Sequence, residues 1–224
     1  MRVLLLFALA LASGGHPPLA GKTIVIDPGH NGGNWAHPAE INRLVDAGGF
    51  RKACDTTGTS TADGYSEAAY TFDVATRLAS ILRRAGAHVV LTRTSNDGVG
   101  PCIDERAAIG NRAHADAAIS IHADGGPPAG RGFHVIYLHS RRLALDVRAA
   151  FRAATGEPYA DYIGHAGLDV RTDLGGLNLS TVPKVFVETG NMRNAGDAAR
   201  LESADYRQRE AVALARGLET FLLR

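Results

Sequence analysis

Short apolar runs alternate with helically spaced apolar positions along most of the chain. The runs are typical of buried strands and lie at residues 23–27, 88–93, 117–122, 133–139 and 184–188. Apolar residues recur at the spacing of one helix face in residues 67–85, 104–115, 141–154 and 205–223. This alternation predicts a single-domain α/β sandwich in which helices flank a largely parallel, twisted sheet.

Two local features refine this pattern. Asp104 stands at the start of the second predicted helix, where an aspartate side chain is a good N-cap, so we expect it to cap that helix. Residues 31–66 contain several glycines and no sustained apolar period, so we expect this stretch to be irregular.

Residues 1–20 have the pattern of a secretory signal peptide. A positively charged start is followed by an unbroken apolar run from Val3 to Ala12 and then by small, turn-forming residues. The run is shorter than the roughly 20 residues that a membrane-spanning helix needs. Cleavage after Ala12 or after Ala20 fits this pattern, and a buried core strand or helix is the alternative. We expect an exported protein, in the periplasm, the cell wall or outside the cell, with a mature domain at residues 22–224 and no membrane span.

The composition of the chain argues against nucleic acid as a binding partner. Lys and Arg number 24 against 23 Asp and Glu, so the chain lacks the basic excess of a nucleic-acid-binding protein. Aromatic residues make up 6%, which is sparse for a platform that stacks single-stranded nucleic acid. The remaining composition is ordinary for a globular domain, and we expect a monomer that binds no nucleic acid.

The two cysteines, Cys54 and Cys102, are consistent with export, because disulfides persist in oxidising compartments. We predict that they pair, which would stabilise the fold by about 4 kcal/mol by constraining the unfolded chain. Two free thiols are the alternative. Neither cysteine lies in a C-x-x-C motif, so the sequence does not favour a redox enzyme.

Polar residues gather at the ends of three predicted strands. His30 follows the first strand, His122 ends the third and Glu188 ends the last. Parallel strands direct their carboxyl ends to one edge of a sheet, so we expect these side chains to meet there, close to Glu67 at the start of the first long helix. Two histidines and a glutamate around an open position form a ligand set of catalytic zinc, and a further carboxylate can accept the proton of activated water.

Each of these residues also has a structural interpretation. A histidine at a strand end is more often exposed or hydrogen-bonded than bound to metal, and a glutamate at a helix start often interacts with the helix dipole. Glu188 is harder to explain in this way, because a buried carboxylate is unfavourable unless it is paired. From spacing alone, a zinc site and an ordinary polar edge remain alternatives.

Four ordered motifs carry a resemblance to a known family. They are TIVIDPGHNGG at 23–33; Ser66–Glu67; Arg106, Asn111 and Ala115–Asp116 with SIHAD at 120–124; and Leu177–Asn178, Pro183 and VETG at 187–190, followed by Asn194. In this order they resemble the zinc-dependent N-acetylmuramoyl-L-alanine amidases of the amidase type 3 family over about residues 22–222. The chain is most similar to stand-alone exported members from actinobacteria, including mycobacteria.

The resemblance implies a specific site and reaction. It implies that His30, Glu67 and His122 bind one zinc ion and that Glu188 is the catalytic carboxylate. The implied fold is the phosphorylase/hydrolase-like α/β sandwich. The implied substrate is peptidoglycan or its muropeptide fragments, cut between the lactyl group of N-acetylmuramic acid and the L-alanine of the stem peptide. Turnover or remodelling of the cell wall is the corresponding role, which an exported location fits independently.

Other residues near the motifs have less specific roles. Arg171 and Asn178 precede the last strand and are candidates for substrate contacts, with a solvated loop as the alternative. Asp27 is either an acceptor for a ligand imidazole or simply a turn residue. The remaining histidines have no motif context and are interpreted as structural or exposed: His37, His88, His114, His134, His139 and His165.

The chain departs from the family pattern in two places. Asp124 stands where the family often has asparagine, so its part in substrate contact is open. The stretch 34–65 is long for the family and carries Cys54. We expect it to form a hairpin or loop beside the cleft, tethered by the bridge to Cys102.

Three other functions fit parts of the pattern. A non-catalytic peptidoglycan-binding module or activator would keep the fold without turnover, although all four implied site positions are filled here. A zinc peptidase would use the same metal site on a peptide bond. A purely structural exported domain is the third alternative.

Overall fold

The computed structural model describes residues 17–224, and residues 1–16, which hold most of the predicted signal peptide, lie outside the described range. One sheet has the strand order β4–β1–β5–β8–β6–β7. Its strands are β1 (Thr23–Pro28), β4 (His88–Leu91), β5 (Ala117–Asp124), β6 (His134–Tyr137), β7 (Leu168–Val170) and β8 (Lys184–Asn191). Strands β4, β1, β5 and β8 are parallel, whereas β6 is antiparallel to β8 and parallel to β7. The predicted, largely parallel sheet is therefore confirmed.

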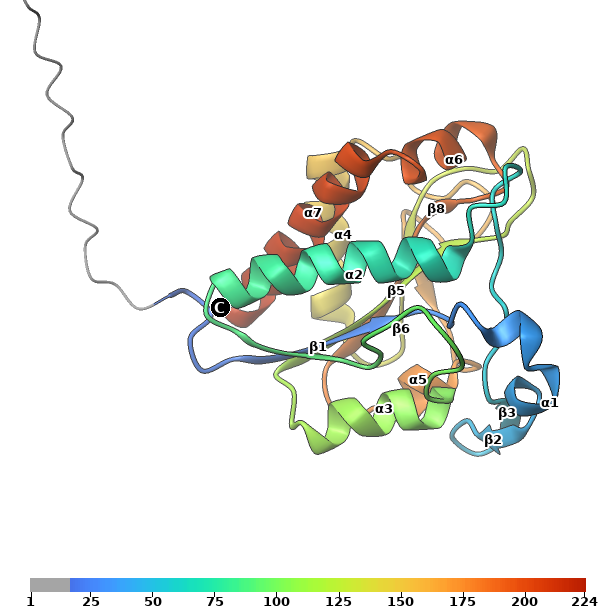
Figure 1. The fold of residues 1–224 in the computed structure, drawn as a ribbon. Helices are drawn as coiled ribbons and strands as arrows, with labels where there is room; N and C mark the ends of the chain where they lie inside the picture. Colours follow the sequence, from blue (N-terminus) through green and yellow to red (C-terminus); the bar gives the residue numbers. More distant parts are fainter. Residues whose placement is uncertain (1–16) are drawn as a thin grey trace, which may run out of the picture.

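Helices cover both faces of the sheet (Figure 1). On one face lie α2 (Glu67–Arg84), α4 (Arg141–Thr155) and α7 (Ala204–Leu222), with α6 (Ala195–Leu201) leading into α7. On the other face lie α3 (Ile103–Arg112) and the short α5 (Gly175–Asn178). Among the described residues, no helix combines the length and the apolar character that crossing a bilayer would require.

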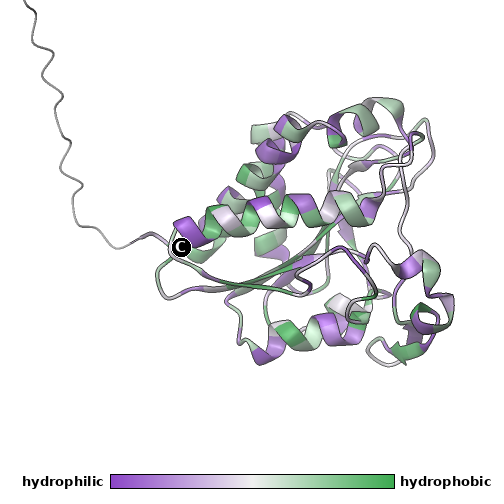
Figure 2. Ribbon diagram, in the orientation of Figure 1, coloured by the Kyte–Doolittle hydropathy of each residue, from purple (hydrophilic) through white to green (hydrophobic). Residues whose placement is uncertain are grey.

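The sheet separates a large core from a small one. Ile24 and Ile26 belong to the large core against α2, α4 and α7, whereas Val25 belongs to the small core with Ala115 and Ala118. Successive side chains of a strand point to opposite faces, so a strand covered on both faces must be apolar throughout. Figure 2 shows this apolar character along the central strands. It explains why the strands stand out in the sequence as continuous apolar runs.

Some predicted details are wrong. The helix predicted from Asp104 begins at Ile103, and Cys102 occupies its N-cap position without a side-chain hydrogen bond. The Asp104 carboxylate accepts a hydrogen bond from the Glu105 backbone inside the first turn instead. Strand β7 and helices α5 and α6 were not predicted, because each is too short to establish an apolar period.

The stretch 34–65 contains more regular structure than its sequence pattern predicts. It forms the short helices η1 (Asn34–Ala36) and α1 (Pro38–Ile41), then an antiparallel hairpin of β2 (Leu44–Asp46) and β3 (Arg51–Ala53). Of the two forms that we expected for this stretch, a hairpin or a loop, the structure contains the hairpin.

A disulfide joins Cys54 to Cys102, as predicted. The bridge connects the end of the hairpin to the start of α3, across a sequence separation of 48. A loop of this length corresponds to about 4 kcal/mol of stabilisation on the chain-entropy model. The Cys54 carbonyl also accepts a hydrogen bond of 2.9 Å from the Ile103 backbone. The residues that follow Cys54 are therefore held close to α3.

Candidate functional site

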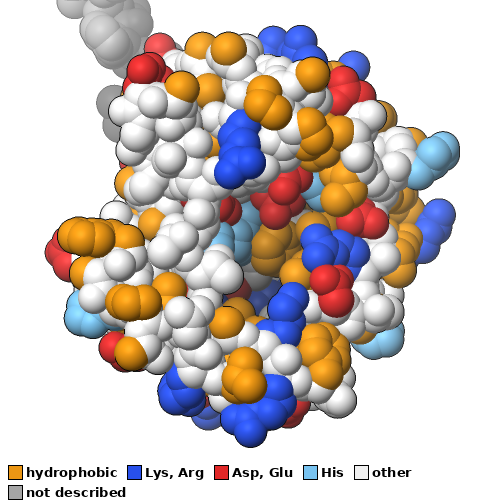
Figure 3. Space-filling view, turned by 90° about the vertical axis from the view of Figure 1, so that its right-hand side faces the viewer, with side chains coloured by type: hydrophobic (Ala, Val, Ile, Leu, Met, Phe, Trp, Pro, Cys, Tyr) orange, Lys and Arg blue, Asp and Glu red, His pale blue; other side chains and the backbone are white. Residues whose placement is uncertain are grey.

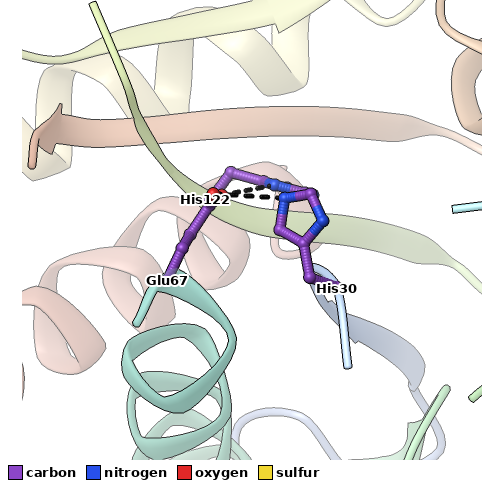
Figure 4. A group of neighbouring side chains, drawn as sticks. All are labelled: His30, Glu67 and His122. Carbon is purple, nitrogen blue, oxygen red and sulfur yellow. Dashed lines mark hydrogen bonds and ion pairs between the residues drawn. The ribbon is translucent and has the colours of Figure 1, made fainter. Parts of the chain in front are cut away.

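Three side chains with metal-binding atoms converge at the carboxyl edge of the sheet (Figure 4). His30 Nε2 lies 3.2 Å from Glu67 Oε2, and His122 Nδ1 lies 2.9 Å from Glu67 Oε1. One such atom from each residue lies within 4.8 Å of the other two. The structure thus brings together the three residues that the sequence analysis predicted as zinc ligands, whose metal-binding role remains a prediction.

Regular elements position each of the three residues. His122 lies on β5, and Glu67 is the first residue of α2. His30 lies two residues after the end of β1. The N-cap of α2 is Ser66, whose hydroxyl accepts a hydrogen bond from the Ala69 backbone, so the helix start is well defined. His30 has a φ of 56°, a backbone conformation that is unfavourable for a residue other than glycine and is often found at functional sites.

Two glycines make room for the cluster. A Cβ atom on Gly29 would lie 2.2 Å from the His122 ring. A Cβ atom on Gly58, whose φ is +73°, would lie 2.8 Å from Glu67 Oε2 and 2.8 Å from the His30 ring. Any larger residue at either position would therefore displace a predicted ligand.

The charges of the cluster depend strongly on one another. Burial lowers the pKa of His30, but the charge of Glu67 and hydrogen bonds with Asp55 and Glu67 outweigh burial and raise that pKa to about 10. Burial would raise the pKa of Glu67, yet the neighbouring His30 and His122 hold it well below its ordinary value. The carboxylate is therefore ionised and available as a ligand. Because a metal binds neutral imidazole, metal binding here competes with a proton on His30.

Asp55 was not identified from the sequence, although it contacts His30. His30 Nδ1 lies 3.3 Å from Asp55 Oδ1 and 3.1 Å from the Thr56 carbonyl oxygen. These acceptors favour a proton on Nδ1, which leaves Nε2, the atom that faces Glu67, free to bind a metal. Asp55 immediately follows Cys54, so the disulfide helps to place it. No sequence signal marks Asp55, because it lies in the irregular segment outside the motifs.

Replacing Asp55 with asparagine is expected to weaken zinc affinity by about 10- to 100-fold, the usual effect of losing a residue that orients a metal-bound histidine. Competition against a chelator of known affinity measures this directly. Activity at saturating zinc should fall much less than affinity does. The matched control is Asp63→Asn, which changes an exposed aspartate of the same segment. Equal zinc affinity in the wild type and in Asp55→Asn would show that Thr56 alone orients His30.

Glu188 lies next to the cluster on the neighbouring strand. It is in register with His122 in the β5–β8 pair, and the ring of Phe186 from the same strand stacks on His122 at 3.9 Å. Burial and the charges of Asp124 and Glu67 raise the pKa of Glu188 well above its ordinary value. Its Oε2 atom is shielded from solvent and has no hydrogen-bond partner among the described residues. A raised pKa makes the Glu188 carboxylate a stronger base than an exposed glutamate.

Asp124 forms a second acidic position beside Glu188. Its Oδ2 atom accepts a hydrogen bond of 2.9 Å from the hydroxyl of Tyr162. Burial raises the pKa of Asp124, and the nearby Glu67 adds to this effect, whereas the bond from Tyr162 opposes it. Asp124 therefore contributes to the electrostatics of Glu188 and is itself held in place by Tyr162.

Asp27 does not orient a ligand imidazole. Its carboxylate accepts hydrogen bonds from Thr92 at 2.7 Å and from Ser120 at 2.6 Å, and it pairs with Arg106 at 2.8 Å and Lys184 at 3.2 Å. Burial alone would raise the pKa of Asp27, but Lys184 and Arg106 hold it well below its ordinary value. Asp27 thus ties β1 to strands β5 and β8 and to α3, and it supports the floor of the site.

A cavity of about 390 Å³ opens over the cluster. Its lining includes His30, Glu67, His122, Asp124 and Glu188. Figure 3 shows the corresponding hollow, in which histidine and acidic side chains are visible, with basic side chains on its rim.

Arg171 and Asn178, the predicted substrate contacts, do not line this cavity. Arg171 forms a two-pronged ion pair with Asp173, at 2.8 and 2.7 Å. The side-chain nitrogen of Asn178 donates to the carbonyl oxygens of Ala47 and Thr172, which joins α5 to the hairpin. Contact with a substrate stays a prediction for both residues.

Comparison with known proteins relates the whole fold to one family. A family profile described as "N-acetylmuramoyl-L-alanine amidase" matches residues 24–220. The chain is 44% identical over 214 residues to N-acetylmuramoyl-L-alanine amidase Rv3717 of Mycobacterium tuberculosis, which covers 91% of this chain and 88% of that protein.

Two solved structures are similar in fold as well. The crystal structure of the N-acetylmuramyl-L-alanine amidase Ami1 from Mycobacterium smegmatis has a TM-score of 0.87 and 44% identity, covering 91% of this chain and 98% of that one. N-acetylmuramoyl-L-alanine amidase AmiC2 of Nostoc punctiforme has a TM-score of 0.71 and 30% identity, covering 94% of this chain and 100% of that one.

Proposed function

Because the chain belongs to the N-acetylmuramoyl-L-alanine amidase family and is itself such an amidase, we propose that its peptidoglycan hydrolysis depends on zinc. The proposed reaction cuts the amide between the lactyl group of N-acetylmuramic acid and the L-alanine of the stem peptide. His30, Glu67 and His122 are the proposed ligands of one Zn²⁺ ion, and Glu188 is the proposed catalytic carboxylate.

The observation that supports this proposal most strongly is the convergence of three donor atoms from three separate elements. Two imidazole nitrogens and one carboxylate oxygen lie within 4.8 Å of one another, and their residues line a cavity. Two nitrogens and one oxygen are a ligand set of catalytic zinc, which keeps a fourth position for water or substrate. The close packing of Gly29 and Gly58 against these side chains also fits a site in which ligand placement is tightly constrained.

A zinc ion at this position would supply Lewis acidity, which polarises the substrate carbonyl and makes water acidic enough to ionise near neutral pH. The Glu188 carboxylate accepts the proton of the attacking water. It then returns a proton to the L-alanine nitrogen, because an amine anion is a very poor leaving group at neutral pH. Burial and the charges of Asp124 and Glu67 raise the pKa of Glu188, which makes its carboxylate a stronger base toward the attacking water.

The proposal also includes a location and a role. We infer export from the pattern of residues 1–20, with residues 22–224 as the catalytic domain, and the disulfide is consistent with an oxidising compartment. Peptidoglycan lies outside the cytoplasmic membrane, so an exported amidase would reach it directly. Turnover or remodelling of the cell wall is the role that follows.

Mass spectrometry of a digested muramyl peptide tests the reaction. The mature protein is incubated with a muramyl peptide alone, with a chelator, and with a chelator followed by excess zinc. We expect release of free stem peptide that begins with L-alanine, loss of this product under chelation and its return with zinc. Cleavage within the stem peptide would assign the site to a peptidase. Activity that survives complete removal of metal would contradict zinc dependence.

A further inference from the structure

A second cavity lies beside the one that contains the predicted ligands. It has a volume of about 630 Å³ and shares Gly58, Thr59 and Gly125 with the first cavity. Gly58 lines both cavities and packs directly against His30 and Glu67. A molecule in the second cavity therefore lies directly next to the proposed reaction centre.

The second cavity differs in chemistry from the first. Arg193 is the one charged residue in its lining, whereas the first cavity carries Glu67, Asp124 and Glu188. Its remaining polar side chains are neutral hydroxyls and one amide, from Asn31, Thr57, Thr59, Ser60 and Ser66. Neutral groups that both donate and accept hydrogen bonds suit a ligand rich in hydroxyl and amide groups.

Trp35 adds an aromatic surface to this lining. It is the single tryptophan of the chain, lies in η1, and its side chain is 78% exposed. Because Trp35 both lines the polar groove and is left in solvent, its ring offers a flat apolar face to a ligand there. The apolar CH face of a sugar ring can pack on such an indole while the sugar hydroxyls bond to the groove.

We propose that the second cavity is a subsite for the glycan strand. It binds the neutral acetamido sugar next to the muramic acid residue whose amide is cleaved, with the sugar face stacked on Trp35. The stem peptide occupies the first cavity in this arrangement. This inference rests on the proposed function, and it predicts a preference for substrates that carry a saccharide beyond the muramic acid residue itself.

Tryptophan fluorescence tests the subsite without any reaction. The probe is a peptide-free oligosaccharide of alternating N-acetylglucosamine and N-acetylmuramic acid, which contains no amide to the stem peptide. Because Trp35 is the single fluorophore of its kind, titration of the mature wild-type protein should shift or quench its emission with saturation. Emission that responds to free stem peptide but not to the oligosaccharide would overturn the proposal.

Kinetics of a variant provide the second readout. Trp35→Ala is expected to lower kcat/KM about tenfold on a disaccharide peptide, because this is the loss typical of removing a stacked aromatic side chain. The same variant should leave kcat/KM on a muramyl dipeptide unchanged. Trp35→Phe should restore part of the difference. The matched control is Phe50→Ala, which removes a 40% exposed aromatic residue of the hairpin that lines neither cavity.

The two proposals fail in different ways. If the wild type cleaves both substrates with equal kcat/KM and Trp35→Ala changes neither value, the glycan subsite is wrong and the amidase mechanism stands. If neither substrate is cleaved by zinc-loaded protein but the oligosaccharide still changes the Trp35 emission, the reaction proposal is wrong and saccharide binding stands. An equal loss on both substrates in Trp35→Ala would show a structural role for Trp35 and would overturn the subsite.

Discussion

Replacing Glu188 with glutamine is expected to lower kcat by about 10³-fold while the zinc content of the protein stays at one ion per chain. Glutamine keeps the size of the side chain but can neither accept the proton of the attacking water nor return one to the leaving nitrogen. Glu188 lies on β8 beside His122, outside the group of three proposed ligands, so metal binding should survive. Steady-state release of stem peptide and metal analysis of the same sample give the two values.

The control for this experiment is Glu202→Gln, which changes an exposed glutamate at the end of α6. Its turnover and zinc content should equal those of the wild type. Near-normal turnover in Glu188→Gln would overturn the role of Glu188 as the proton carrier. A joint loss of zinc and activity would instead indicate that Glu188 is a ligand.

Replacing His122 with alanine is expected to remove both zinc and activity. Structural zinc sites bind with about 10–16 kcal/mol, so the loss of one of three protein ligands should cost about 3–5 kcal/mol. This corresponds to a fall in zinc affinity on the order of 10³-fold. Chelator competition measures the affinity, and turnover is followed at several zinc concentrations. Excess zinc should restore little activity, because the remaining ligands no longer fix the geometry of the ion.

The control for His122 is His37→Ala, which removes an exposed histidine that lies outside both cavities. A thermal melt of each variant in the presence of chelator separates the loss of metal from a loss of the fold. His122→Ala should then unfold close to the temperature of the metal-free wild type. A variant that retains zinc and turns over substrate would remove His122 from the ligand set.

Much of the candidate site was predictable because its residues lie near the carboxyl ends of strands or at the start of a helix. An apolar run followed by a histidine or a glutamate places that side chain at the carboxyl edge of a parallel sheet. His30 follows β1 as predicted, whereas His122 and Glu188 lie inside β5 and β8, which continue beyond the predicted ends to Asp124 and Asn191. Glu67 is the first residue of α2. The apolar runs show where these strands lie, because a strand that is buried on both faces is apolar throughout. The interpretation of the polar residues as a zinc site needed the family resemblance as well.

Strand direction was only partly predictable. The runs at 117–122 and 133–139 look alike in sequence, yet β5 is parallel to β8 and β6 is antiparallel to it. An apolar run records burial, which is the same for both directions of the chain. The connections between strands and the packing of the helices decide the direction, and these depend on the whole fold.

The sequence predicted the fold class and the pairing of Cys54 with Cys102, both of which the structure confirms. It also singled out His30, Glu67, His122 and Glu188, which the structure brings close together and whose roles remain proposals. The side chains that surround these residues could not be predicted and depend on how distant segments of the chain pack together. Asp55, rather than Asp27, faces His30, and Trp35 lies in the groove beside the predicted ligands. Asp55 and Trp35 both belong to an irregular segment without periodicity, so their positions depend on the disulfide and on long-range hydrogen bonds. The pattern of apolar and polar residues shows which positions are buried and where turns lie. Contacts between segments that are distant in sequence depend instead on the free energy of the whole folded protein.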